Sequence, residues 1–390
     1  MLSKAADARR AKLFEPLRVR GLEIDNRFVM APMTRSFCPD GAPPPKVAAY
    51  YERRALGGVG LIITEGVGIP HPAALGLSEV DGLDVPHMFG RSALEAWKVV
   101  VERVHNAGGK IAPQLWHQGP IRKPGTGPYP NAPVARPSGL WGPQGRATMF
   151  SSSYLSEVAQ ATTPMSDKDI QDVIDAYAEA ARNAARLGFD AIAIHGAHGY
   201  LIDAFLWAET NRRQDRWGGA TEERAAFAAA IVAAIRREVG EDLPIIFRFS
   251  QWKQQDFRAR IAQTPEELAR LLGPITDAGA DIFDASVRYF NHAAFDGAAT
   301  SLAGWAKRVT GKYSLTVGGV GLGSGMLDSA RDGIAPGADN IDLVLDRFER
   351  NEFDLVGVGR ALLHDPEFVE RVRNGAPLLG YHEQSRRVLR

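Results

Sequence analysis

The chain has 390 residues, enough for one large domain with insertions or for two ordinary domains. Its 46 lysines and arginines balance 46 aspartates and glutamates, and this zero net charge argues against a nucleic-acid or anionic-membrane partner. Cys38 is the only cysteine, which excludes an internal disulfide, a cysteine-based zinc site and a protein-ligated iron–sulfur cluster, and favours a reducing cytosol.

The N-terminal segment Met1–Arg10 lacks the apolar core of a secretory signal, so we expect a solvated arm. The longest apolar runs, such as Val59–Thr64, have the length of strands and are too short to span a bilayer. The sequence therefore indicates neither a secretory signal nor a membrane span.

Eight short apolar runs, rich in β-branched residues, recur at intervals that suit a strand followed by a helix. Most are continuous rather than alternating, as expected of parallel strands buried on both faces. The predicted strands are Arg27–Met30, Val59–Thr64, Lys110–Leu115, Asp190–Ile194, Pro244–Phe249, Asp281–Ala285, Tyr313–Val317 and Asp354–Val358.

Amphipathic helical stretches lie between these runs. The clearest is Asp169–Leu187, which follows a capping-box-like start at Ser166. Further helices are expected to begin near Thr221 and near Thr264, where Pro265 suits a first helical position.

Strands that alternate with helices in this way predict an α/β fold, a (β/α)8 TIM barrel, as a single domain over residues 1–390. Residues 12–25 are expected to form a hairpin that closes the barrel floor. A doubly wound sheet is the alternative, but it would show a glycine-rich phosphate turn after its first strand, and Met30–Thr34 is not one. Residues 120–165, rich in Pro, Gly and Ser, predict a lid or subdomain, a long loop insertion after the third strand.

The segment after the fourth predicted strand indicates chemistry most directly. His195 and His198 are three residues apart, and Tyr200 follows two residues later. Two imidazoles can donate to one developing oxyanion and a phenol can deliver a proton, as activation of a carbonyl and protonation of its α-carbon require. On a regular helix Tyr200 would point away from both histidines, so convergence needs an irregular turn, which Gly196 and Gly199 permit.

A metal site is the alternative for the two histidines. Helix-borne zinc motifs place their histidines four residues apart and add a nearby acid, whereas this segment has neither that spacing nor a third ligand. We therefore expect no metal.

The other strand ends also have polar, aromatic or glycine residues, at the end of the barrel where such folds carry their chemistry. They are Ala31–Thr34, Gly66, Gln114, Trp116, Arg248, Gly318–Gly321 and Gly357–Arg360. Taken in order, these segments resemble the motifs of the old yellow enzymes, which are FMN-dependent ene reductases. The resemblance covers nearly the whole chain and rests on Asn26–Arg35, Ile63–Gly66, Gln114–His117, His195–Phe205 and Val358–Arg360.

The resemblance implies a flavoprotein oxidoreductase with FMN bound non-covalently across the barrel mouth and NAD(P)H as the reductant. It places the flavin ring against Ala31, Pro32, Met33 and Thr34, with Gly66 leaving room for the ring, Gln114 at its pyrimidine edge and Arg248 beside N1 and O2. The FMN phosphate is implied at Gly319, Val320, Gly321, Gly359 and Arg360.

The implied reaction reduces the carbon–carbon double bond of an α,β-unsaturated carbonyl compound. Hydride passes from NAD(P)H through FMN to the β-carbon, while His195 and His198 bind the carbonyl oxygen and Tyr200 protonates the α-carbon. Trp116 is expected to line the substrate cavity.

A related flavoprotein dehydrogenase or oxidase, and a flavin-binding protein without turnover, are the alternative functions. We expect a small-molecule substrate, no nucleic-acid or membrane partner and a cytoplasmic location; a homodimer is compatible with these features.

Overall fold

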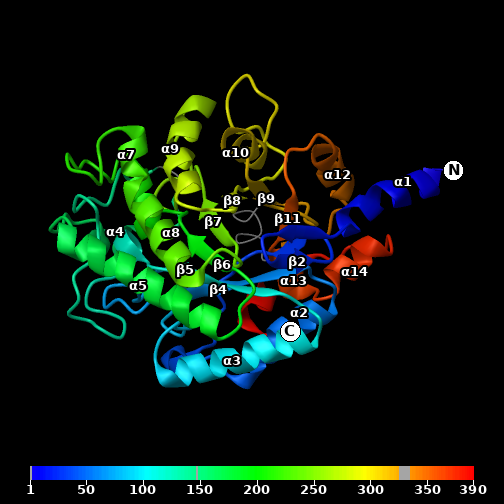
Figure 1. The fold of residues 1–390 in the computed structure, drawn as a ribbon, viewed down its shortest axis with the longest axis horizontal. Helices are drawn as coiled ribbons and strands as arrows, with labels where there is room; N and C mark the ends of the chain where they lie inside the picture. Colours follow the sequence, from blue (N-terminus) through cyan, green and yellow to red (C-terminus); the bar gives the residue numbers. More distant parts are fainter. Residues whose placement is uncertain (1, 146–147, 325–333) are drawn as a thin grey trace.

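A closed barrel of eight parallel strands forms the centre of the computed structural model, which describes residues 2–145, 148–324 and 334–390 (Figure 1). The strands follow one another in chain order around the barrel, and the last pairs with the first to close it. They are β3 (Phe28–Met30), β4 (Leu61–Gly68), β5 (Ile111–Trp116), β6 (Ile192–His195), β7 (Ile245–Phe249), β8 (Ile282–Ser286), β9 (Tyr313–Val317) and β11 (Leu355–Val358). The predicted (β/α)8 barrel is confirmed, and each predicted strand overlaps an observed one.

Helices connect the consecutive strands and cover the outside of the barrel (Figure 1). The connecting helices are α2 (Pro45–Leu56), α3 (Arg91–Asn106), α5 (Asp167–Arg186), α8 (Ala226–Val239), α9 (Pro265–Asp277), α10 (Leu302–Thr310) and α12 (Ile341–Glu349). Shorter helices are α4 (Ser152–Val158), α6 (Leu201–Leu206), α7 (Thr221–Arg224), α13 (Arg360–His364) and α14 (Phe368–Arg373).

The predicted helix starts are found where the sequence indicates them. Ser166 accepts the backbone N–H of Asp169, and the Asp169 carboxylate accepts the N–H of Ser166 at 2.8 Å, which is a capping box. The Thr264 hydroxyl caps α9 by accepting the Glu267 N–H, with Pro265 as the first residue of the helix. The stretch expected from Thr221 is divided into α7 and α8.

Strand β4 extends beyond its predicted end and reaches Gly68. Its register against β5 shifts between Ile63 and Gly66. A Cβ atom at Gly66 would lie 2.7 Å from the indole of Trp116, so only glycine allows the two strands this approach. The extension therefore places Gly66 and Trp116 together at the barrel mouth.

The hairpin expected over residues 12–25 is present as β1 (Leu17–Val19) and β2 (Leu22–Ile24), paired antiparallel. The buried side chains of Val19, Leu22 and Ile24 join those of the barrel interior in one apolar cluster. Removal of this apolar surface from water holds the hairpin against the barrel.

The N-terminal segment forms helix α1 (Leu2–Ala11) and not the expected solvated arm. Arg9 bonds the carboxylates of Asp346 at 2.7 Å and Glu349 at 2.8 Å on α12, and Lys12 bonds Glu349 at 2.9 Å. These partners lie far away in the sequence, so a local reading of the segment could not find them. No helix of the described residues has the length and apolar character that a membrane span requires.

The insertion after β5 has little regular structure, apart from a short turn at Gly119–Ile121 and α4. Its loops are held by buried arginines that donate to backbone carbonyls: the Arg122 guanidinium reaches Thr126 at 2.7 Å and Tyr129 at 2.8 Å. Such bonds satisfy carbonyls that lack a helix or sheet partner. Residues 146–147 of the expected lid lie outside the described residues.

Candidate active site

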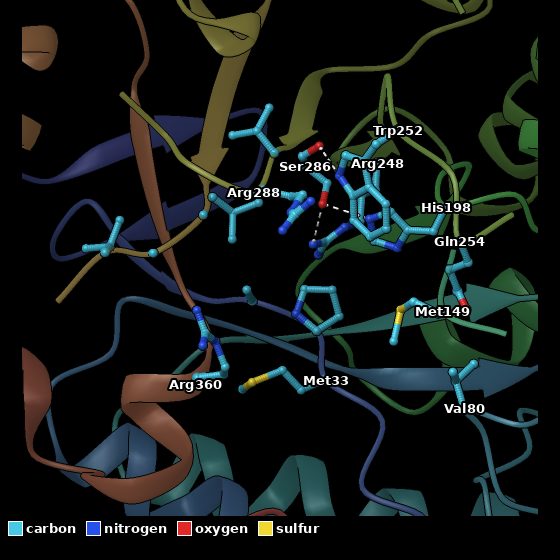
Figure 2. Close-up of a pocket in the computed structure, with 18 of the residues that line it drawn as sticks. Met33, Val80, Met149, His198, Arg248, Trp252, Gln254, Ser286, Arg288 and Arg360 are labelled. Atoms are coloured by element: carbon cyan, nitrogen blue, oxygen red, sulfur yellow. Dashed lines mark hydrogen bonds between the residues drawn. The ribbon is translucent and has the colours of Figure 1, made fainter. Parts of the chain in front are cut away.

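A cavity of about 260 Å³ opens at the carboxyl ends of the barrel strands, and a smaller one of about 110 Å³ adjoins it. Pro32, His198, Tyr200 and Arg248 line both. Figure 2 shows Met33 and Arg360 on one side of the larger cavity and His198, Trp252 and Gln254 on the opposite side. Of the residues predicted for the site, these cavities bring together Ala31, Pro32, Met33, Thr34, Gly66, Gln114, Trp116, His195, His198, Tyr200, Arg248, Gly319, Val320, Gly359 and Arg360.

The backbone after β6 reverses so that its three functional side chains can meet. His198 has φ 66° and Gly199 has φ 86°, both in the left-handed region. Gly196 is required for a different reason, because a Cβ there would lie 2.5 Å from the ring of Phe247. The irregular turn predicted from the two glycines is present, with His198 itself as the second left-handed residue.

A buried ion pair fixes this turn from the loop after β7. The Asp203 carboxylate accepts the Gly199 N–H at 2.6 Å and the Lys253 ammonium at 2.8 Å. Lys253 also donates to the Ser250 carbonyl at 3.0 Å, and the Ser250 hydroxyl accepts the His198 N–H at 3.0 Å. Burial raises the pKa of Asp203 to about 6, so at neutral pH it is ionised beside Lys253.

His195, Tyr200 and Trp116 converge at the mouth of the barrel. The ring centroids of His195 and Tyr200 lie 4.8 Å apart, and those of Trp116 and Tyr200 lie 5.0 Å apart. The Nδ1 atom of His195 accepts the Ala197 N–H at 3.4 Å, which favours the tautomer with the proton on Nε2. Burial, and then the charge of Arg248, lowers the pKa of His195 well below its ordinary value, so this imidazole is a neutral donor.

The hydroxyl of Tyr200 donates to the carboxylate of Asp81 at 2.8 Å, and both residues are buried. Asp81 also bonds the hydroxyl of Ser78 at 3.0 Å. Burial raises the pKa of Asp81 to about 6, against these hydrogen bonds and the charge of Arg386. Burial, and then the charge of Asp81, raises the pKa of Tyr200 well above its ordinary value.

His198 has a different environment from His195. Its Nε2 atom lies 2.8 Å from the hydroxyl oxygen of Ser286, and its ring stacks on Trp252 at 4.3 Å. Burial, and then neighbouring charges including those of Arg248 and Lys253, lowers the pKa of His198 well below its ordinary value. Of the two histidines, His195 is therefore the one whose Nε2 faces the cavity without a partner among the described residues.

Arg248 on β7 faces a carboxylate that sequence reasoning missed. Its Nη1 atom lies 3.2 Å from Asp284 Oδ2 on β8, and its Nη2 donates to Ser286 at 3.1 Å. Burial lowers the pKa of Arg248 and raises that of Asp284, and in each case the attraction of the partner opposes the shift. The charge of Arg248 is thus balanced within the barrel, a feature that the resemblance alone did not indicate.

Gln114 and Arg248 are among the buried polar groups at the cavities that have donor capacity left over. The Gln114 Nε2 and Arg248 Nε atoms are buried and have no hydrogen-bond partner among the described residues, whereas Arg248 Nη1 contacts Asp284 as an ion pair without a hydrogen bond. A buried donor of this kind calls for an acceptor, which a water molecule or a ligand can supply. These donors suit the carbonyl oxygens and ring nitrogens along one edge of a planar heterocycle.

The expected phosphate end needs one correction. Gly319 and Val320 line the larger cavity with Gly359 and Arg360, but Gly321 does not. The Gly321 N–H donates to the Asn340 side chain at 2.8 Å, and a Cβ at Gly321 would lie 2.4 Å from Phe368. Its role is packing against the loop before α12, so its N–H is not available to an anion.

Gly66 also has a role other than the expected one. It lines the smaller cavity, as predicted, but its absent side chain makes room for the Trp116 indole. Gly66 therefore also fixes the position of Trp116, and its predicted contact with a flavin ring stays a prediction.

Comparisons with known proteins identify the family of the chain. Residues 12–378 match the NADH:flavin oxidoreductase / NADH oxidase family. The chain is 33% identical over 379 residues to chanoclavine-I aldehyde reductase of Penicillium roqueforti (strain FM164), an alignment that covers 95% of this chain and 91% of that protein. It is 36% identical over 234 residues to the putative 12-oxophytodienoate reductase 11 of Oryza sativa subsp. japonica, and it spans 60% of that protein's length. The solved structure of morphinone reductase is similar with a TM-score of 0.73 and 27% identity, covering 94% of this chain and 90% of that one.

The Asp203–Lys253 pair predicts a strong effect on stability. Asp203→Ala leaves a buried ammonium unpaired and should lower the free energy of unfolding by about 3–5 kcal/mol. The double variant Asp203→Leu/Lys253→Met removes both charges and should recover most of that loss. Urea unfolding followed by tryptophan fluorescence measures both. Asp172→Ala, in the exposed Lys168–Asp172 pair, is the matched control and should change little; equal losses in the two single variants would contradict the role given to Asp203.

Proposed function

The chain belongs to the NADH:flavin oxidoreductase / NADH oxidase family, and we propose that it is an FMN-dependent ene reductase that acts on α,β-unsaturated carbonyl compounds. The old yellow enzyme resemblance seen in the sequence agrees with this membership. The observation that carries the proposal is the convergence of a neutral imidazole and a phenol, His195 and Tyr200, over a cavity whose buried donors lack partners.

The residues of the barrel mouth fit FMN. Gln114 and Arg248 present the unpartnered donors that the pyrimidine edge of a flavin would satisfy. Gly319, Val320, Gly359 and Arg360 would hold the phosphate at the other end of the larger cavity. When bound, FMN supplies the two-electron chemistry that carries hydride from NAD(P)H to the substrate.

The protein itself would bind and polarise the substrate. His195 Nε2–H would donate to the carbonyl oxygen, where negative charge develops as the double bond is reduced. The Nε2 atom of His198 already bonds Ser286, so this ring would contribute as part of the cavity wall beside the substrate. Trp116 would form one wall, because its ring packs edge-on against Tyr200.

Tyr200 would supply the proton to the α-carbon. Its phenol is protonated at neutral pH, because burial and Asp81 raise its pKa. The 2.8 Å hydrogen bond to Asp81 fixes the direction of the hydroxyl, and a protonated Asp81 would release the phenolic proton toward a substrate. Asp81 is therefore a positioning residue for the proposed acid.

A flavoprotein dehydrogenase or oxidase and a non-catalytic flavin carrier are the competing functions. The paired acid Tyr200–Asp81 favours the reductase, because a carrier needs no proton donor. The finer expectations stay predictions: NADP(H) as the nucleotide, a cytoplasmic location, a homodimer, and residues 120–165 as a lid on a single FMN-binding domain.

The function is tested by the visible spectrum of the purified, FMN-loaded protein. NADPH should bleach the flavin absorbance, and 2-cyclohexenone should restore it without oxygen. Tyr200→Phe should leave the bleaching rate near that of the wild type and slow the recovery by roughly 10²–10⁴, the usual contribution of a general acid. Stopped-flow absorbance separates the two stages.

Reoxidation by a quinone is the control for Tyr200→Phe, because it needs no proton on carbon and should be unaffected. A variant that bleaches slowly but recovers normally with the enone would show that Tyr200 is not the acid. Absence of bleaching with both NADPH and NADH would instead remove the reductase assignment.

Asp81 predicts a pH dependence for the recovery stage. Its pKa of about 6 means that it is ionised above that pH and then draws the phenolic proton of Tyr200 toward itself. The rate of recovery with the enone should therefore rise as the pH falls through about 6. Asp81→Asn should flatten this profile between pH 5 and 8, roughly. The charged and titratable neighbours include Tyr200, Tyr154 and Arg386, so an unchanged profile in Asp81→Asn would assign the dependence to another group.

The Arg248–Asp284 ion pair is expected to influence the midpoint potential of the bound flavin. Asp284→Asn removes the charge that balances Arg248, so the reduced, negatively charged flavin should become more stable and its midpoint potential should rise. A shift of roughly 30 mV corresponds to about 1.4 kcal/mol for two electrons. Spectroelectrochemical titration measures it. Asp354→Asn, whose carboxylate pairs with Lys307 before β11, is the control; a fall in potential in Asp284→Asn would contradict this pairing.

A further inference from the structure

A separate cavity of about 580 Å³ lies beside the two active-site cavities, between the loops that follow β7 and β8. We call it the second cavity. Its walls include three arginines, Arg258, Arg260 and Arg288, and the aromatic side chains of Phe257 and Trp252. No aspartate or glutamate is among its described lining residues. In a chain whose net charge is zero, this is a local concentration of positive charge.

The three guanidinium groups have no carboxylate partners among the described residues. Arg260 donates to the backbone carbonyl of Ala294 at 2.7 Å, and the Arg288 guanidinium lies over the ring of Phe257 at 5.1 Å. The Nε atom of Arg288 is buried without a hydrogen-bond partner. Asp256, the nearest acid in sequence, accepts the backbone N–H of Arg258 at 2.9 Å and forms no salt bridge with its side chain. An arginine cluster left unpaired in this way is suited to an anion with several oxygens.

The second cavity adjoins the active-site cavity and shares part of its lining. Trp252, Val287 and Arg288 line both cavities, and Trp252 stacks on His198. Figure 2 shows Trp252 and Arg288 at the edge of the active-site cavity. The arginine-lined cavity therefore lies next to the site where one end of a long substrate molecule would bind.

From this charge and the shared lining, we propose that the second cavity binds the phosphorylated adenosine end of NADPH, with Arg258 and Arg260 on the 2′-phosphate and Arg288 nearer the pyrophosphate. The proposal rests on the proposed function, because NADPH is the reductant in that reaction. A 2′-phosphate is close to doubly charged at neutral pH, so NADPH brings more negative charge than NADH to the same arginines. Recognition of this phosphate by arginine is a known solution in nucleotide-binding proteins.

The test compares the two nucleotides with the FMN-loaded enzyme. Arg258 is exposed and does not line the active-site cavities, so Arg258→Gln is the informative variant. It should raise the KM for NADPH about tenfold, the effect of one charge-assisted contact. The KM for NADH and the rate of reoxidation by an enone should change less than about twofold. Arg258→Lys keeps the charge and should lie between the variant and the wild type.

A binding measurement makes the site testable without turnover. Adenosine 2′,5′-bisphosphate, titrated calorimetrically into the oxidised enzyme, should bind the wild type and compete with NADPH. Its affinity should fall about tenfold in Arg258→Gln, and rising salt should weaken it, since the charges are accessible to ions. Arg91→Gln, on the exposed face of α3, is the control variant and should behave as the wild type.

Equal changes in the KM values for NADPH and NADH would overturn the proposal, as would failure of the bisphosphate to bind. A raised KM for a carboxylated enone, with NADPH unaffected, would also overturn it and assign the arginines to an anionic substrate. Binding of the bisphosphate without flavin reduction by either nucleotide would support the site and reject the reductase function, so the two failures are distinguishable.

Discussion

The buried Asp203–Lys253 ion pair is the interaction on which the active-site arrangement depends. It joins the segment after β6 to the loop after β7, through bonds to the Gly199 N–H and the Ser250 carbonyl. The left-handed conformation of His198 costs free energy, because its Cβ crowds the backbone. The ion pair and its hydrogen bonds offset that cost, and the result is that the rings of His195 and Tyr200 meet at 4.8 Å. A regular helical continuation of β6 would have separated them.

A second constraint is the balance of charge inside the barrel. Arg248 faces Asp284 in an environment where both are almost fully buried, and an unpaired charge there would be strongly destabilising. Pairing with Asp284 avoids this destabilisation, but the negative charge of Asp284 also reduces the electric field that Arg248 exerts on a neighbouring ligand. The outer arginines Arg258 and Arg260 differ in this respect, because they are closer to solvent and have no such partner among the described residues. Electrostatic attraction of an anion is therefore concentrated outside the site of chemistry.

Much of the fold could be predicted from the sequence, because most strands are continuous apolar runs and each predicted run overlaps a barrel strand. Helix caps such as Ser166 were equally local signals. The N-terminal helix was missed because its ion pairs join it to α12, more than three hundred residues away. Gly321 was assigned to phosphate from its motif, whereas its N–H bonds Asn340, a partner that no local pattern indicates.

The site was predicted in outline, and what was missed depends on pairing between elements. Asp284 could have been noticed as an acid within an apolar strand, since a buried carboxylate needs a positive partner on a neighbouring strand. Asp81 gave no such signal, because it lies in a loop whose course only the tertiary structure defines.

The contact between Asp81 and Tyr200 combines two opposed effects. The hydrogen bond fixes the phenol against Trp116, but the charge of Asp81 raises the pKa of Tyr200 and so weakens it as an acid. A general acid is most effective when its pKa lies near the working pH. Burial resolves part of this conflict, since it brings the pKa of Asp81 to about 6, where the carboxyl is partly neutral under mildly acidic conditions. Desolvation therefore has two consequences. It raises the pKa of the Tyr200 phenol, and it also raises the pKa of Asp81, so that a neutral Asp81 no longer attracts the phenolic proton away from a substrate.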